Sequence, residues 1–288
     1  MIQARGGIEQ PRPPRPLSGE FLITVLVSVW TVGCGTSLMT LPTGPGVPAP
    51  DIVSVVEEAT AACAAVSTYT AELTVRGEIA RRRIPRTRLL IGLMAPASAY
   101  LDALASFGES LFTYAATDDQ ATLLLPRDDR FLAGGDPEAV LEAVTGIPLG
   151  AAELRTTITG CMMVTVSGGS RLGDDWRRVA HGSSEFYLRR NAPGDPWRLV
   201  SVVHDGAAST AWRAEYLEFS GGLPTEMRLS SRDSDRFDLR LSLEGIELDQ
   251  GLDASVFQID ISSSMTVISL EELRRSGPLG SVFGSDER

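Results

Sequence analysis

Polar and apolar residues alternate along most of this chain, and that alternation predicts strands. In the segment YTAELTVRGEIA, residues 69–80, one face carries Tyr69, Ala71, Leu73, Val75 and Ile79, and the other carries threonine, glutamate and arginine. A period of two with one polar face is typical of a half-exposed strand. Comparable segments span residues 87–93, 98–104, 110–126, 130–135, 176–182, 185–190, 197–205, 211–220, 224–232, 237–249 and 256–260.

Helical spacing of apolar residues appears in two other places. Residues 51–69 form the first predicted helix, with Asp51 as its cap, and residues 136–146 and 150–160 form two more. A short helix is expected at 269–277. Ten or eleven antiparallel strands with these helices predict a mainly β (α+β) fold, in which a curved antiparallel sheet forms an unclosed β-barrel with a helical lid.

A short apolar stretch precedes this body. Residues 21–32 carry no charge and follow three arginines, but they are fewer than the roughly 20 residues that a membrane-spanning helix needs. The order basic, apolar, small is that of a secretory signal. Because Thr31-Val32-Gly33 leads directly to Cys34, the segment resembles a bacterial lipobox. We expect residues 1–33 to be a signal peptide and Cys34 to be an acylated anchor of the palmitate type. The other interpretation is a buried core cysteine.

We divide the remainder of the chain into three parts. Residues 34–50 are rich in proline, glycine and threonine, which predicts a flexible linker after the anchor. Residues 51–270 suit one all-β domain rather than two. Residues 271–288 are expected to be a disordered tail.

Charge and motif content exclude several classes of function. The net charge of −11 argues against a nucleic-acid partner, which requires a basic surface. The two histidines, His181 and His204, are not spaced as metal ligands, and the paired aspartates lie in turn segments. No nucleophile or phosphate-binding motif is recognisable. We therefore predict a protein that is not an enzyme and has no metal and no cofactor.

Two cysteines remain once Cys34 is assigned to the anchor. Cys63 and Cys161 form an even pair in a chain predicted to be exported, which is compatible with a disulfide. Two separate buried thiols fit the sequence as well.

The order of these segments resembles the bacterial lipoprotein carriers and receptors of the LolA/LolB type. The resemblance rests on YTAELTVRGEI, RTRLLIGLMAP, YLDALASFGESLFTYAATDDQATLLLP, VTGIPLGAAELRTTITG and GLPTEMRLS…LRLSLEGIELDQGLDASVFQI, and it covers about residues 51–262. It implies an open barrel around a hydrophobic cavity closed by helices. It also implies that the protein binds acyl chains of lipids or lipidated proteins rather than catalysing a reaction.

Within that family, the receptor is itself an outer-membrane lipoprotein, so Cys34 makes it the closer likeness. Gly35 stands where an aspartate would retain a lipoprotein at the inner membrane, which implies the periplasmic face of the outer membrane. The resemblance implies a monomer with a chaperone-like role in lipoprotein transport. Phe107 stands at the position of the receptor's exposed apolar loop residue and is the candidate membrane-insertion tip. Its other interpretation is an ordinary core residue.

Ten residues are predicted to line the apolar cavity: Leu73, Val75, Leu89, Ile91, Leu93, Tyr100, Leu104, Leu111, Leu123 and Leu125. The same residues would also suit a filled core packed against the helices. Two other functions therefore stay open. One is an envelope scaffold lipoprotein that binds a protein through its acidic face, and the other is a sensor or chaperone subunit for a different amphiphile.

Overall fold

The computed structural model of this chain describes residues 37–105, 107–162, 164–207, 210–232 and 236–277. The chain divides into the units Met1–Leu38 and Met39–Arg288, and the description below concerns the second. The predicted signal peptide 1–33, the anchor residue Cys34 and the end of the chain after residue 277 lie outside the described residues.

Fifteen strands form a single sheet in the described residues. They are β1 (Val47–Pro48), β2 (Thr68–Ile79), β3 (Arg82–Met94), β4 (Ser98–Leu104), β5 (Ser110–Ala116), β6 (Ala121–Leu125), β7 (Arg130–Gly135), β8 (Ser170–Arg171), β9 (Trp176–His181), β10 (Ser184–Arg189), β11 (Arg198–His204), β12 (Trp212–Ser220), β13 (Leu223–Ser231), β14 (Phe237–Leu248) and β15 (Thr266–Val267). The sheet is not closed, which confirms the predicted fold class.

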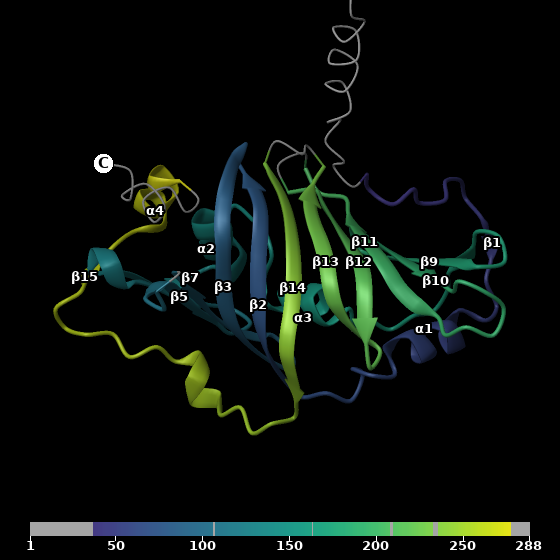
Figure 1. The fold of residues 1–288 in the computed structure, drawn as a ribbon, viewed down its shortest axis with the longest axis horizontal. Helices are drawn as coiled ribbons and strands as arrows, with labels where there is room; N and C mark the ends of the chain where they lie inside the picture. Colours follow the sequence, from purple (N-terminus) through teal and green to yellow (C-terminus); the bar gives the residue numbers. More distant parts are fainter. Residues whose placement is uncertain (1–36, 106, 163, 208–209, 233–235, 278–288) are drawn as a thin grey trace, which may run out of the picture. The chain divides into compact units, whose positions relative to one another are not determined.

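Two meanders build this sheet. Strands β2 to β7 follow one another as neighbours, and so do β8 to β14. The pairing of β14 with β2 then joins the meanders side by side, antiparallel, as Figure 1 shows. At the far edge, β15 pairs with β7 in the one parallel contact among the described strands.

Four α-helices accompany the sheet in the described residues: α1 (Ile52–Thr60), α2 (Pro137–Thr145), α3 (Ala151–Thr159) and α4 (Leu270–Ser276). Two single turns of 3-10 helix, η1 (Pro126–Asp128) and η2 (Ala254–Phe257), complete the elements. Helix α2 has the start and stop that its sequence predicts. The Asp136 side chain accepts a hydrogen bond from the Ala139 N–H, Pro137 opens the helix, and Gly146 ends it with φ 79°.

Helices α1, α2 and α3 cover one face of the sheet. Helix α1 contacts β10 and β11, α2 contacts β6, and α3 contacts both β4 and β13. Figure 1 shows α2 and α3 behind the central strands. At the end of α3, Gly160 has φ 66°, and a side chain there would meet the Pro224 ring at 2.8 Å. Glycine thus lets α3 end directly against β13.

The folded unit extends further at both ends than the sequence predicts. It begins at Met39 rather than Asp51, because residues of the expected linker are held to the sheet: the Met39 N–H donates to Glu215 Oε1 at 2.8 Å, and β1 pairs with β8. At the other end, the short helix expected at 269–277 is present as α4, which extends past residue 270, where the domain was expected to end. Its Leu273 is buried, and the helix packs against α2.

Local details also differ from the expectations. Helix α1 ends at Thr60 rather than continuing to residue 69. The strand expected to begin at residue 87 begins already at Arg82, as β3, directly after a turn at Ala80 and Arg81, both with positive φ. The strand expected at residues 256–260 is partly the turn η2.

Asp51 precedes α1 as predicted, but its side chain does not cap the helix. Its carboxylate oxygens accept hydrogen bonds from Arg177 Nε at 2.9 Å and Nη2 at 2.6 Å. The Arg177 side chain is buried. This hydrogen bond from Arg177 holds the pKa of Asp51 below its ordinary value. A bidentate pair with an arginine makes two charge-assisted hydrogen bonds between opposite charges, whereas a cap accepts from a neutral N–H, which explains the difference.

We expect Asp51→Asn to lower the free energy of unfolding at neutral pH by about 1 kcal/mol, a modest value because Asp51 is partly exposed to solvent. Since the folded-state pKa of Asp51 lies below its ordinary 3.8, the contribution is present above that value and is lost as the pH falls through the lower folded pKa. Urea unfolding between neutral and acid pH tests this. Glu72→Gln is the matched control, because Glu72 makes a similar pair with the exposed Arg88. Equal losses in the two variants would contradict the prediction.

Candidate functional site

The candidate site is the apolar interior between the sheet and helices α1 to α3. On β2, Tyr69, Ala71 and Leu73 point inward and are buried, whereas Glu72 and Arg76 point outward. Inward-pointing residues of both meanders and of the three helices form one continuous cluster of buried apolar side chains. The helices contribute Ile52, Val55, Val56, Leu141 and Ile158, among others.

Eight of the ten predicted wall residues belong to this cluster: Leu73, Val75, Leu89, Ile91, Leu93, Leu111, Leu123 and Leu125. Leu93 and Leu123 are completely buried, and Val75 is partly buried. The structure therefore places most of the predicted wall together. In this state the wall packs directly against the covering helices, as a core does.

Tyr100 and Leu104 lie on the opposite face of the sheet. On β4 the inward positions are Ala99, Leu101 and Ala103, all buried, so the residues between them point outward. The physical reason is that α3 covers the face that carries Ala99, Leu101 and Ala103, whereas Tyr100 and Leu104 alternate with them. Tyr100 is partly covered on the outer face, where η2 packs on β4, and this burial raises its pKa.

Two tyrosines of the sheet hydrogen-bond to the covering helices. The hydroxyl of Tyr114 on β5 donates to the Pro137 carbonyl of α2, and that of Tyr216 on β12 donates to the Thr157 carbonyl of α3, both at 3.0 Å. Both side chains are fully buried, and burial raises the pKa of each. These bonds fix two of the three covering helices at defined points in a mainly apolar interior.

Arg155 is a charged residue within this cover. It lies on α3, is 3% exposed, and donates from Nη2 to the Val66 carbonyl at 2.5 Å. Its Nε and Nη1 have no hydrogen-bond partner in the described part of the chain. Burial lowers the pKa of this guanidinium. Unused donors at a buried site are costly, so this position favours an additional acceptor.

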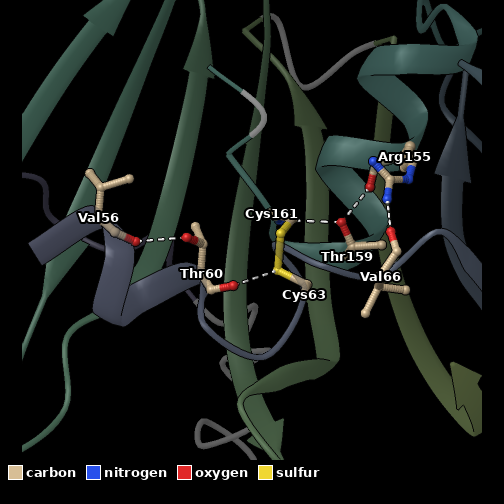
Figure 2. Close-up of a disulfide and its surroundings, with 7 residues drawn as sticks. All are labelled: Val56, Thr60, Cys63, Val66, Arg155, Thr159 and Cys161. Atoms are coloured by element: carbon tan, nitrogen blue, oxygen red, sulfur yellow. Dashed lines mark hydrogen bonds between the residues drawn. A yellow bond between two sulfur atoms is a disulfide. The ribbon is translucent and has the colours of Figure 1, made fainter. Parts of the chain in front are cut away.

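Cys63 and Cys161 form a disulfide that joins the covering helices, as Figure 2 shows. Cys63 follows α1 and Cys161 follows α3, and the two are 98 residues apart in sequence. Each helix ends in a threonine whose hydroxyl donates to the carbonyl four residues earlier: Thr60 to Val56 at 2.8 Å, and Thr159 to Arg155 at 2.7 Å. The disulfide thus ties the ends of α1 and α3 into one covering unit.

Phe107 does not fold back into the core. It lies in the turn between β4 and β5 and is 97% exposed. Gly108 follows it with φ 85° and has open space around it. The Phe107 ring therefore projects from the turn into solvent.

Several hollows of about 410 to 420 Å³ are present, and buried residues of the cluster line two of them, Tyr216 in one and Leu223 and Leu243 in another. One adjoins Met39 and Phe219, one adjoins residues 42–47, and one adjoins the ends of β12 and β14; none of these three is lined by a predicted wall residue. Across the described ranges there is no group of three or more histidine, cysteine or acidic residues able to hold a metal. Nor does any helix in those ranges have the length and hydrophobicity needed to span a membrane.

Tyr114, Tyr216 and Arg155 are the residues that sequence reasoning missed. The alternation of strands β5 and β12 places Tyr114 and Tyr216 on the inner face, as it would any apolar residue. It does not reveal that their hydroxyl groups hydrogen-bond to a helix. Arg155 had a stronger signal in the sequence, because it is a charged residue in a predicted helix and its neighbours are buried.

Comparisons with known proteins complete this description. Neither a protein-family model nor a curated protein sequence matches the chain significantly. Among solved structures, it is similar to a LolA superfamily protein from Nitrosomonas europaea, with a TM-score of 0.52 and 9% identity over 72% of this chain and 97% of that one.

Two further solved structures have lower TM-scores. An outer membrane lipoprotein-sorting protein domain from Vibrio parahaemolyticus has a TM-score of 0.42 and 10% identity, over 72% of this chain and 95% of that one. Lipoprotein LppX from Mycobacterium tuberculosis has a TM-score of 0.31 and 8% identity, over 71% and 98%. From the unclosed sheet, the helices over one face and the likeness to the Nitrosomonas protein, we conclude that this chain has a LolA/LolB-like fold.

Proposed function

We propose that this protein is a membrane-anchored lipoprotein that binds acyl chains, of lipids or lipidated client proteins, between its curved sheet and helices α1 to α3. The observation that carries the proposal is the cover itself. A continuous apolar wall is closed by three helices of nine residues each. Isolated helices this short have little stability of their own, so their positions depend on packing against the wall. An acyl chain would make apolar contact with the wall equivalent to the contact that the helices make.

Exchange of helix for ligand is a balance between similar apolar contributions, because the ligand must replace the burial that helix side chains such as Ile52, Val55 and Leu141 give up. Breaking the hydrogen bonds of Tyr114 and Tyr216 costs about 1 kcal/mol each. Burying ten methylene groups of an acyl chain contributes about 8 kcal/mol before the entropy of binding is subtracted. Arg155 adds donors suited to an ester or carboxylate oxygen of the bound molecule. Binding of this kind requires no catalytic residue.

The anchor is the second part of the proposal. We assign acylation to Cys34, with the protein on the periplasmic face of the outer membrane and a role in lipoprotein localisation. Because the folded unit begins at Met39, five residues after Cys34, the tether would span at most about 18 Å. The disulfide is compatible with an exported protein, since such bonds persist in oxidising compartments.

Cys34→Ala tests the anchor. We expect this variant to leave the membrane fraction for the soluble fraction, because one or two acyl chains are the attachment that the proposal supplies. Fractionation of cells that express wild type and variant, followed by mass analysis of the mature N-terminus, measures it. An unchanged membrane fraction would refute acylation at Cys34 as the attachment.

Phe107→Glu tests the exposed turn as a membrane-insertion tip. A charge at the end of the turn cannot enter the apolar layer, so we expect transfer of a lipidated client into acceptor membranes to fall severalfold or more. Phe107→Leu is the control and should transfer normally. Because Phe107 is 97% exposed, the unfolding free energy should change little in either variant. Normal transfer by the glutamate variant would remove Phe107 from the mechanism.

A further inference from the structure

Arg189 and Arg198 stand directly opposite one another on the neighbouring strands β10 and β11. The residues beside them, Leu188 and Leu199, are also paired and are buried in the core, so both arginines lie on the outer face. Like charges at directly opposed positions destabilise a sheet. Such a pair requires either compensating groups or a bound counter-ion.

No compensating carboxylate pairs with either arginine in the described part of the chain. Other arginines nearby do form ion pairs: Arg178 with Glu185, and Arg190 with Asp175. Arg189 and Arg198 instead stack on aromatic rings. Stacking leaves the N–H groups of a guanidinium available for an acceptor.

The stacking fixes the positions of both groups. The Arg189 guanidinium carbon lies 5.2 Å from the centre of the Trp176 ring, and that of Arg198 lies 5.0 Å from the centre of the Phe219 ring. Trp176 is directly opposite Arg189 on β9. Each ring therefore restrains one guanidinium group that would otherwise move freely in solvent, and Phe219, like Arg198, belongs to the strand pair β11–β12 on the other side of Arg189 from Trp176.

Both arginines line one hollow of about 420 Å³. Leu217, Phe219 and Met39 contribute apolar surface to it, and Leu217 is 40% exposed. Asp195 is the one carboxylate among its lining residues, against two guanidinium groups. The hollow thus combines paired donors for an anion with an apolar side.

We propose that this hollow binds the phosphate of an anionic phospholipid headgroup. A guanidinium group binds phosphate through two parallel hydrogen bonds, and the apolar side of the hollow fits the carbon atoms next to the phosphate. The placement rests on the anchor proposed above: Met39 lines the hollow and is five residues from Cys34, so the site lies within reach of the membrane surface. The net charge of −11 does not oppose this, since charges beyond about 8 Å are largely screened at physiological ionic strength.

The test uses the full chain carrying Cys34→Ser, so that acylation plays no part. Its co-sedimentation is compared on vesicles of phosphatidylcholine alone and on vesicles that also contain phosphatidylglycerol. We expect a preference for the anionic vesicles that falls about tenfold or more in Arg189→Gln/Arg198→Gln, because each arginine near an anionic surface contributes roughly a fivefold factor. Arg82→Gln/Arg83→Gln removes the same charge from exposed positions on β3 and should keep the preference.

A second arm separates the lipid from free phosphate. Soluble dihexanoyl phosphatidylglycerol and inorganic phosphate are titrated while tryptophan fluorescence is followed, since Trp176 stacks on Arg189. We expect a change with the lipid that is absent from the Arg189→Gln/Arg198→Gln variant. Equal loss in both double variants, or a response to inorganic phosphate with no vesicle preference, would overturn the proposal. The membrane fraction of the wild-type chain tests the anchor separately, so the two failures are distinguishable.

Discussion

Removing the disulfide with Cys63→Ala/Cys161→Ala is expected to lower the free energy of unfolding by about 2 to 5 kcal/mol. The two cysteines are 98 residues apart, so the bond restricts a long loop of the unfolded chain, and the chain-entropy model gives about 4 to 5 kcal/mol for a loop of that size. Both side chains are buried, so the substitutions also leave small cavities. This is the largest single effect that the structure predicts.

Urea unfolding under non-reducing conditions measures that loss. Wild type treated with reductant should move toward the double variant, whereas Cys34→Ala should keep the wild-type midpoint, because Cys34 is not part of the bond. Replacing both cysteines by alanine avoids the free thiol that a single substitution would leave. A wild-type midpoint that does not respond to reductant would contradict the prediction.

Glu215→Ala is expected to cost about 3 kcal/mol and to release the N-terminal segment from the sheet. Glu215 is 2% exposed and pairs with Arg213, which donates to the Met39 carbonyl while Glu215 accepts from the Met39 N–H. Burial already lowers the pKa of Arg213. Removing the carboxylate leaves this arginine partly buried without its partner, which is the costly way to break such a pair.

Two variants control for this prediction. Arg213→Met/Glu215→Leu removes both charges, so it should cost much less than Glu215→Ala alone. Asp205→Ala breaks an exposed pair with Arg232 and should have a small effect. Limited proteolysis near residues 39–48 reports release of the segment. If Glu215→Ala and Asp205→Ala had the same free energy of unfolding and the same resistance to proteolysis, the proposed role of the buried pair would be wrong.

Local sequence patterns predicted the elements that depend on neighbouring residues. Strand β2 follows its alternation, and α2 begins and ends at the aspartate, proline and glycine that the sequence indicates. Such features are set by backbone conformation and by contacts within a few residues. The unclosed sheet could therefore be predicted from the number and order of strands.

Contacts between distant segments could not be predicted in this way. Asp51 binds Arg177, which is 126 residues away, instead of capping its own helix. Met39 is held by Arg213 and Glu215, more than 170 residues away, although its proline- and glycine-rich surroundings indicated only a linker. No local pattern encodes either pair.

The assignment of faces on β4 was wrong for a related reason. Tyr100 and Leu104 are large apolar residues, yet the buried face of their strand carries Ala99, Leu101 and Ala103. Alternation alone separates the two faces but does not say which one is covered. Here α3 covers the inner face, and η2 covers only part of the outer one.

The proposed acyl-chain binding requires the apolar interior to exchange its helical cover for the ligand. The structure describes the packed state, in which the wall and helices α1 to α3 form one cluster. Tyr114 and Tyr216 hold α2 and α3 in that state, and the disulfide makes α1 and α3 a single unit. Weakening the two tyrosine bonds while keeping the disulfide should therefore favour the ligand-bound state.

Native mass spectrometry of the Cys34→Ala chain with an acylated peptide or a phospholipid tests this exchange. We expect a bound mass that is lost on a detergent wash, and we expect Tyr114→Phe/Tyr216→Phe to bind at lower ligand concentration because its cover opens at less cost. A ligand-free mass at every concentration, in both the Cys34→Ala chain and the tyrosine variant, would show that the interior is a filled core. That result would contradict acyl-chain binding.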